Sequence, residues 1–445
     1  MENINSSDKI IQKCIDISCV EKKNFRNNSF SFGWKNNISN WKDNLKYNYI
    51  RFNNTKFEMI PTNIHLFNKN YNTQNEQEKF KFYQKFGKII MVSYRSKYKP
   101  QPNYKNNKQY TSDCGWGCMI RSSQMIICRA LYKIFKYNLK EKEKDNLAKI
   151  IIPFIMDNNL IINENEYPQM NSYINKLKAF GKVDIVEIDP PFSIHKICIL
   201  GEKFGRACGE WFSDFELPKI YDIINSTFDI LPNVSIIHFN SVIRLKTILD
   251  RCFKEDTTNI ENNINNNFDN DINTIHNENE IKFEDKKYIF EKMGLIFVTV
   301  RLGINKVTSD YIPSLKNVFN CKECIGLIGG KKNSNSASYF FGYYENNLLY
   351  LDPHHNYTSI QILDNENINT YLNKTIYKLK FTSLKGGLTI GFLFRNFKEF
   401  IELLSFVKSE KKAQFPCFDY SEKIVDDDIK KVNSIMNEMS NKDDF

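Results

Sequence analysis

The chain has 445 residues, of which 41% are hydrophobic and 26% are charged. That hydrophobic content can fill an ordinary globular core, so the composition excludes a chain that is disordered throughout. The 62 Lys and Arg residues exceed the 52 Asp and Glu residues, which gives a net charge of +10. The excess is spread thinly and forms no basic block, so we expect no nucleic-acid partner, while transient contact with an anionic membrane surface remains an alternative.

The N-terminus and the cysteines indicate a compartment. The first fourteen residues, MENINSSDKIIQKC, contain no continuous apolar segment, and nowhere do eighteen uncharged apolar residues follow one another. Neither a signal peptide nor a membrane span is therefore predicted. The eleven Cys are an odd number scattered along the chain, which is typical of free thiols in a reducing compartment. We expect a cytoplasmic protein whose thiols are available for chemistry.

The first half of the chain is predicted to be mainly helical after an irregular start. Residues 1–82 are expected to form a partly ordered arm, because the first fifty or so are rich in Asn and Lys with isolated aromatic residues. After Cys118 the apolar residues recur at helical spacing, which predicts a buried helix that begins at Cys118. The same spacing predicts further helices over 167–180, 194–204, 217–228 and 398–408.

The second half is predicted to hold most of the strands. Residues 255–285 are dominated by Asn, Asp and Glu and are expected to be a flexible low-complexity insertion. The run GLIFVTVRLG at 294–303 is typical of a central strand, and residues 338–344 and 348–352 have the pattern of a β-hairpin. Residues 409–445 regain many charges and are expected to be a mobile tail.

Two segments contain the candidate chemistry: TSDCGWGCMIRSSQ at 111–124 and YLDPHHNY at 350–357. The thiolate is the nucleophilic form of Cys, and the unpaired N–H groups and dipole at a helix start favour it. Cys118 has that predicted position. Gly115 and Gly117 leave the preceding loop without Cβ atoms, so a substrate backbone can approach closely. The backbone N–H of Cys118 would then face a developing oxyanion.

Asp352 and His354 are the candidate partners of Cys118. They are separated by one residue at the predicted end of a strand, so the two-residue period places both side chains on one face while His355 points away. Asp352 would fix the tautomer of His354, whose other ring nitrogen would face the thiol. Taken singly, each feature has a plainer interpretation: a surface hydrogen bond for His354, and a packed small hydrophobic side chain for Cys118.

The motifs together closely resemble the autophagins, the cysteine proteases of autophagy. The resemblance covers roughly residues 83–408 and preserves the order of its blocks. The most specific blocks are D-x-G-W-G-C-M-[IL]-R, at 113–121, and D-P-H, at 352–354. The others are SYR at 93–95, S-I-H at 193–195, G-E-W-F at 209–212, V-R-L-G at 300–303 and I-G-G-K-x-N-S at 328–334.

The resemblance implies an α/β (α+β) chain, with a papain-like cysteine protease fold and a small auxiliary subdomain within residues 83–408. It implies cleavage of a ubiquitin-like autophagy modifier after a C-terminal Gly, and release of the modifier from phosphatidylethanolamine. We expect this chain to be a monomer that uses no cofactor and no metal.

The resemblance also implies roles for particular residues. Cys118, His354 and Asp352 correspond to the catalytic triad, and Tyr94 corresponds to the residue whose hydroxyl helps to stabilise the oxyanion. The substrate-binding positions are Trp211, which covers the cleft and holds the Gly tail, together with Trp116 and Gly117. A core aromatic is the alternative interpretation of both Trp211 and Tyr94.

One segment departs from the family pattern. Where many members carry a Leu-Pro-Gln-Ser gate, this chain has Cys321-Lys322-Glu323-Cys324. We expect this loop to lie against Trp211 over the cleft, where the two thiols would form a redox-sensitive pair. A zinc site would need two more ligands, for which no second matching Cys pair exists, and two unremarkable thiols are the plainest interpretation.

Two rival functions are distinguished by the same motifs. A modifier-binding adaptor without activity would have lost part of the triad, whereas Cys118, Asp352 and His354 are all present. A different thiol enzyme, such as a deubiquitinase or a transglutaminase, would lack the combination of G-W-G-C-M with D-P-H. We therefore interpret the chain as a thiol protease.

Overall fold

The structure is a computed structural model of the whole chain, and it describes a defined set of residues. These are 55–57, 62–139, 147–161, 167–179, 187–256, 280–283, 286–332, 334, 336–364, 367–372 and 374–422. Most of the expected N-terminal arm, the middle of the predicted insertion and the end of the predicted tail lie outside them.

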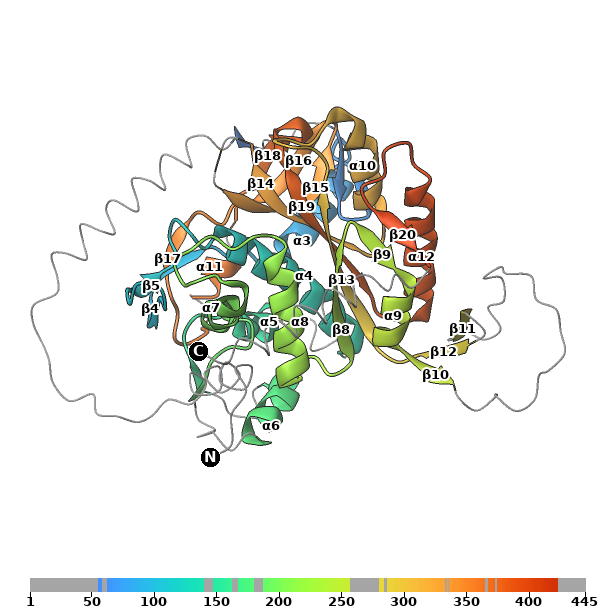
Figure 1. The fold of residues 1–445 in the computed structure, drawn as a ribbon. Helices are drawn as coiled ribbons and strands as arrows, with labels where there is room; N and C mark the ends of the chain where they lie inside the picture. The colour runs from blue at the N-terminus through green and yellow to red at the C-terminus, as the bar shows by residue number, and fades with distance from the viewer. Residues whose placement is uncertain are drawn as a thin grey trace, which may run out of the picture.

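A ten-stranded sheet forms the centre of the fold (Figure 1). Its main strands are antiparallel, except that β8 and β13 pair in parallel. In spatial order they are β1 (Thr55–Lys56), β18 (Tyr377–Lys380), β16 (Asn347–Leu351), β15 (Ala337–Tyr344), β14 (Cys324–Lys331), β19 (Leu384–Phe394), β13 (Met293–Arg301) and β8 (Val234–Asn240). In addition, β2 (Asn63–Leu66) pairs with β15, and β3 (Lys69–Asn72) pairs with β2.

Alternate residues of the central strands enter two separate cores, one on each face of the sheet. On β13, Leu295 and Phe297 belong to one core, whereas Ile296 and Val298 belong to the other. Because successive side chains of a strand point to opposite faces, a strand covered on both sides is apolar at nearly every position. The strand predicted at 294–303 and the hairpin of β15 and β16 are confirmed.

Helices cover both faces of the sheet (Figure 1). The core that contains Cys118 is covered by α3 (Glu76–Gly87), α4 (Cys118–Asn138), α5 (Leu147–Ile151), α6 (Asn171–Ala179), α7 (Ile194–Gly201), α8 (Glu216–Phe228) and α11 (Asn369–Leu372). The opposite core is covered by α9 (Leu245–Cys252), α10 (Ile312–Asn320) and α12 (Phe397–Lys411). The predicted helices correspond to α4, α6, α7, α8 and α12, which confirms them. The expected α/β fold of a papain-like protease is also confirmed.

Smaller elements complete the described chain. Four small sheets contain β4 (Tyr94–Pro102), β5 (Gln109–Ser112) and β17 (Asn356–Thr358); β10 (Phe253–Asp256), β11 (Glu280–Phe283) and β12 (Lys286–Phe290); β9 (Val242–Arg244) and β20 (Asp419–Ser421); β6 (Leu160–Ile161) and β7 (Glu187–Ile188). The 3-10 helices are Ile152–Phe154, Pro168–Met170, Glu202–Phe204, Ser309–Tyr311 and Phe381–Ser383.

The predicted insertion differs from the structure at both of its ends. Residues 255–256 lie in β10 and residues 280–283 form β11, and both strands pair with β12. No sustained period marks these residues in the sequence, and β10 pairs with β12 across most of the predicted insertion. Residues 257–279, the middle of the predicted insertion, lie outside the described ranges.

The ends of the described chain also pack on the fold. The expected boundary at residue 83 falls inside α3, and the one at 408 falls inside α12. Before the first boundary β2 pairs with β15, and after the second β20 pairs with β9. Phe418 is 3% exposed in the second core, so residues beyond 408 contribute to stability. Among the described residues, no helix combines the length and apolarity needed to cross a bilayer.

Candidate active site

The candidate nucleophile is the first residue of α4. Cys118 is completely buried, and Gly117 is the N-cap of the helix. The first N–H groups of a helix have no partner within it, and the N-terminal end of the helix dipole favours negative charge. The structure therefore places the Cys118 thiol and its own N–H at one electropositive point, as the sequence predicts.

The loop before Cys118 needs glycine at two positions for different reasons. Gly115 has φ of 88°, a left-handed conformation that residues with a Cβ rarely adopt. Gly117 has an ordinary backbone, but a Cβ there would lie 2.3 Å from Oδ2 of Asp113. The lack of a side chain at Gly117 thus permits the start of α4 to contact the buried carboxylate of Asp113.

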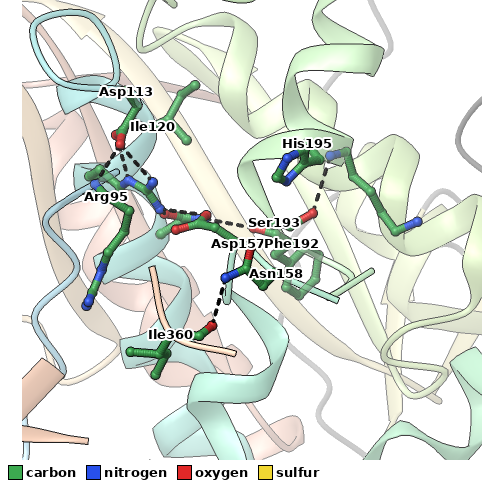
Figure 2. A network of polar contacts seen from close by, with 12 residues as sticks. Arg95, Asp113, Ile120, Asp157, Asn158, Phe192, Ser193, His195 and Ile360 are labelled. Atoms are coloured by element: carbon green, nitrogen blue, oxygen red, sulfur yellow. Dashed lines mark hydrogen bonds and ion pairs between the residues drawn. The ribbon is translucent and has the colours of Figure 1, made fainter. Parts of the chain in front are cut away.

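That carboxylate joins the nucleophile helix to the neighbouring strand β4. Asp113 accepts from the backbone N–H of Arg95 at 2.7 Å and from Nε of Arg121 at 2.7 Å. Arg121, which lies on α4, also donates to Asp157 at 2.9 Å. The three charged groups of this ion-pair network are at most 1% exposed, and Figure 2 shows Asp113 and Asp157 within it. The network therefore sets the position of Tyr94, the neighbour of Arg95, relative to Cys118.

His354 contacts Asp352 in a turn rather than in a strand. β16 ends at Leu351, and the backbone N–H of His354 donates to Oδ1 of Asp352 at 3.3 Å, which is an Asx turn. Nδ1 of His354 hydrogen-bonds the same carboxylate, which leaves Nε2 for the thiol. His355 instead packs against the ring of Tyr357 at 4.1 Å. The side chains lie as predicted, but the turn, not the strand period, is the cause.

The ionisation of the pair follows from its surroundings. Burial lowers the pKa of His354, but the Asp352 charge and hydrogen bonds to Asp352 and Cys118 outweigh it and raise the pKa to about 9. Burial raises the pKa of Asp352, but His354 and Lys331 outweigh it and hold that pKa well below its usual range. At neutral pH the two side chains therefore form an imidazolium–carboxylate pair beside Cys118.

Tyr94 reaches the same point from β4. Tyr94 pairs with Asn356 of β17, and the Tyr94 N–H donates to the carbonyl of Pro353 at 2.9 Å. The ring lies edge-on to His354 at 5.3 Å. Burial, followed by the charge of Cys118, raises the pKa of Tyr94 well above its usual value. The phenol is therefore protonated at neutral pH and can donate a hydrogen bond.

Lys331 is a site residue to which we assigned no role from the sequence. It ends β14, and its Nζ lies 3.7 Å from Oδ2 of Asp352 and 4.4 Å from the ring centre of Tyr350. Burial lowers its pKa, and the Asp352 and Cys118 charges oppose that change. Its position in the I-G-G-K-x-N-S block was the one available signal. Asp157 had no comparable signal.

The predicted substrate-binding residues differ in exposure. Trp116 is 6% exposed, donates through Nε1 to the carbonyl of Ser112 at 3.0 Å, and lies edge-on to Tyr110. Trp211 is 36% exposed on a loop whose Gly209 packs closely against the same Tyr110. The Trp211 loop therefore borders the nucleophile loop through Tyr110. Contact of these residues with a substrate stays a prediction.

The predicted position of the Cys321–Cys324 loop is wrong. Cys324 begins β14, and Lys331 ends it seven residues later, about 23 Å away at the usual rise per residue. Both thiols are free and buried, and they belong to the core on the opposite face from Cys118. Burial raises the pKa of Cys324 to about 12. Among the described residues, no cluster of three His, Cys, Asp or Glu side chains could hold a metal ion.

Comparison with known proteins identifies the family. The family model for the Peptidase C54 catalytic domain matches residues 79–406, most of the chain. The chain belongs to the Peptidase C54 family. It is a thiol protease, and the geometry of Cys118, His354 and Asp352 accords with the chemistry of such an enzyme.

Relatives of this C54 peptidase carry the names of autophagy proteases. The chain is 24% identical to cysteine protease atg4da of Danio rerio, over 86% of this chain and 80% of the relative. It is 24% identical to cysteine protease ATG4C of Xenopus tropicalis, over 74% and 72% of the two chains. It is 23% identical to human cysteine protease ATG4A, over 75% of each. The resemblance to the autophagins is confirmed.

Proposed function

We propose that this C54 peptidase cleaves a ubiquitin-like autophagy modifier after a C-terminal Gly and also releases the modifier from phosphatidylethanolamine. The observation that supports the reaction most strongly is the meeting of Cys118, the His354–Asp352 pair and the Tyr94 hydroxyl at the start of α4. The names of the relatives support the class of substrate. The two reactions share one step, attack on the Gly carbonyl, and differ only in the amine that leaves.

The proposed mechanism assigns a role to Cys118, to His354 and to Tyr94. The Cys118 thiolate attacks the Gly carbonyl carbon, and the resulting oxyanion accepts hydrogen bonds from the Cys118 N–H and the Tyr94 hydroxyl. The His354 imidazolium protonates the leaving amine. Water then hydrolyses the thioester with neutral His354 as the base, which regenerates the thiol.

In this proposal, the enzyme selects its substrate by excluding side chains before the scissile bond as much as by favourable contacts with the tail. Cys118, His354 and Tyr94 are each at most 2% exposed, so a scissile bond reaches the thiol only after neighbouring side chains move. An extended tail with Gly before the scissile bond has no Cβ to clash with the walls of such a narrow site. The same argument disfavours substrates with larger residues there.

The proposal is tested by cleavage of matched substrates. The chain is incubated with a tagged modifier that ends in Gly-X and, separately, with ubiquitin-X. We expect cleavage of the first only, loss of cleavage in Cys118→Ala, and normal cleavage in Cys114→Ala, which removes a nearby thiol that forms no disulfide. Equal cleavage of ubiquitin-X, or activity retained in Cys118→Ala, would contradict the proposal. A modifier coupled to phosphatidylethanolamine in vesicles tests the second reaction.

We further propose that the enzyme acts as a cytoplasmic monomer that touches membranes transiently, through the lipid-linked modifier. Support for a reducing compartment comes from the described cysteines, none of which forms a disulfide. Fractionation of cells and light scattering of the purified chain test the two parts of this proposal. A stable dimer or a lumenal location would contradict it.

A further inference from the structure

A cavity of about 450 Å³ lies far from the candidate active site along the same elements. Arg129, on its wall, follows Cys118 by eleven residues on α4, about 16 Å along the helix axis. Cys324, also on the wall, is at the opposite end of β14 from Lys331. The cavity is therefore separate from the cleft that binds the scissile bond.

Basic side chains dominate the charge of this cavity. Arg395 pairs with Glu399, and Lys322 pairs with Glu402 at 3.0 Å. Apart from these two ion pairs and Lys136, the walls carry one carboxylate, Glu323, and three basic residues: Lys85, Arg129 and Lys133. An anion with more than one charge is the ligand that would balance such a wall.

Arg129 is the most informative of these side chains. It is 7% exposed, and its Nε has no hydrogen-bond partner. Its guanidinium lies 3.8 Å from the ring centre of Phe67, and the residue lines the cavity. A buried guanidinium without an anionic partner is costly, so such groups are usually paired. Within the described part of the chain, Arg129 makes contacts with aromatic rings but no ion pair.

Lys85 of α3 is also surrounded mainly by other positive charges. Burial and the positive charges of Arg129 and Lys136 lower the pKa of Lys85 to about 7. Burial and the charges of Arg129 and Arg395 similarly lower the pKa of Lys133 to about 8, although Glu399 and Glu323 oppose this. A bound anion would relieve the repulsion among these groups.

We propose that this cavity binds an organic phosphate, with the phosphate group held by Arg129 and Lys85. A phosphate monoester carries a charge near −2, and its oxygens match the two parallel donors of a guanidinium. The cavity is larger than inorganic phosphate needs, and Tyr132 and Tyr137 offer aromatic walls for the organic part. The shared chemistry fits either a soluble phosphate ester or a phosphorylated lipid headgroup.

Calorimetric titration of the full chain tests the proposal. The probes are inorganic phosphate, ATP, inositol trisphosphate, and phosphatidylcholine vesicles with or without a phosphorylated phosphatidylinositol. We expect an organic phosphate to bind more tightly than inorganic phosphate. Arg129→Gln and Lys85→Gln should each weaken its binding at least tenfold, the loss of one charge-assisted hydrogen bond.

The matched control is Lys286→Gln, which removes an exposed lysine from β12 outside the cavity and should bind as the wild type does. Thermal unfolding of each variant checks that it is folded, and Lys85→Gln keeps the test valid if Arg129→Gln is unstable. Binding of a soluble ester, or of phosphorylated vesicles alone, supports the proposal and distinguishes the two sources, provided that both variants lose it. No binding of any probe, or equal binding by the variants and the wild type, overturns it.

Discussion

At the scale of single residues, the His354–Asp352 pair determines the pH range in which the site is charged. The pKa of His354 is raised from 6.5 to about 9, while that of Asp352 is lowered from 3.8. A raised His pKa stabilises the fold fully below pH 6.5, and this contribution is lost as the pH rises through about 9. A lowered Asp pKa contributes above about pH 3.8. The pair thus stabilises the fold most between about pH 4 and 6.5 and still contributes at pH 7.

The same ionisation predicts a pH profile for activity. We expect kcat/KM to fall on the alkaline side near pH 9, as His354 loses the proton that it gives to the leaving amine. In Asp352→Asn the charge that outweighs burial is gone, so the alkaline fall should move below pH 7. The rate at neutral pH should drop by roughly 10³-fold to 10⁴-fold. A variant whose alkaline limb stays near pH 9 would show that Asp352 does not set the pKa of His354.

The two adjacent histidines provide a matched comparison. His354→Ala removes the proposed base and should lower the cleavage rate by roughly 10²-fold to 10⁴-fold. His355→Ala removes a ring that contacts Tyr357, and its rate should stay within a few-fold of wild type. Single-turnover cleavage of the Gly-X precursor measures both. Similar losses in the two variants would make the choice of base wrong.

At the scale of elements, one buried network relates the start of α4 to β4. Asp113 is held on three sides, by the Arg95 N–H and by two nitrogens of Arg121. Because Arg121 also pairs with Asp157, the carboxylate of Asp113 cannot turn away without leaving buried charges unpaired. Because the Asp113 carboxylate cannot move, residue 117 must be glycine: the start of α4 approaches Asp113 too closely for a Cβ.

Because of this close approach, we expect a methyl group added at Gly117 to lower the stability of the fold. Gly117→Ala should lower the free energy of unfolding by roughly 1–3 kcal/mol and reduce the cleavage rate, because either α4 or Asp113 must shift. Gly87→Ala is the control: a Cβ there meets no atom within 4 Å, so its unfolding free energy should change by less than about 1 kcal/mol. Urea unfolding and cleavage assays measure the two effects. Equal behaviour of the two variants would argue against the Asp113 contact.

At the scale of the whole molecule, the central sheet separates the candidate active site from the thiols of Cys321 and Cys324. Cys118 and Tyr94 lie in the core on one face, whereas Cys321 and Cys324 lie in the core on the other. Burial raises the pKa of both Cys321 and Cys324, so few of these thiols are deprotonated at neutral pH. Oxidants react mainly with accessible thiolates, so Cys321 and Cys324 are poor targets.

This separation predicts that peroxide sensitivity does not depend on the Cys321–Cys324 loop. The double variant Cys321→Ala with Cys324→Ala should show the peroxide dose response of the wild type, although its stability falls through lost packing in the second core. Cleavage after graded peroxide treatment, with and without dithiothreitol, measures the response. A double variant markedly more resistant than wild type would restore a role for these thiols in regulation.

The sequence by itself determined the features that depend on short segments. The periodicity after Cys118 predicted where α4 begins, and the apolar run at 294–303 predicted β13, because a local pattern reports which faces an element buries. The sequence also predicted that Asp352 and His354 pair, although a turn after β16 rather than the strand period brings them together. Only the tertiary structure decided that Lys331 meets Asp352, that β20 pairs with β9, and that Cys321 and Cys324 lie far from the cleft. These features depend on how segments distant along the chain pack against each other, and the pattern within one segment reports which faces it buries but not which segment it meets.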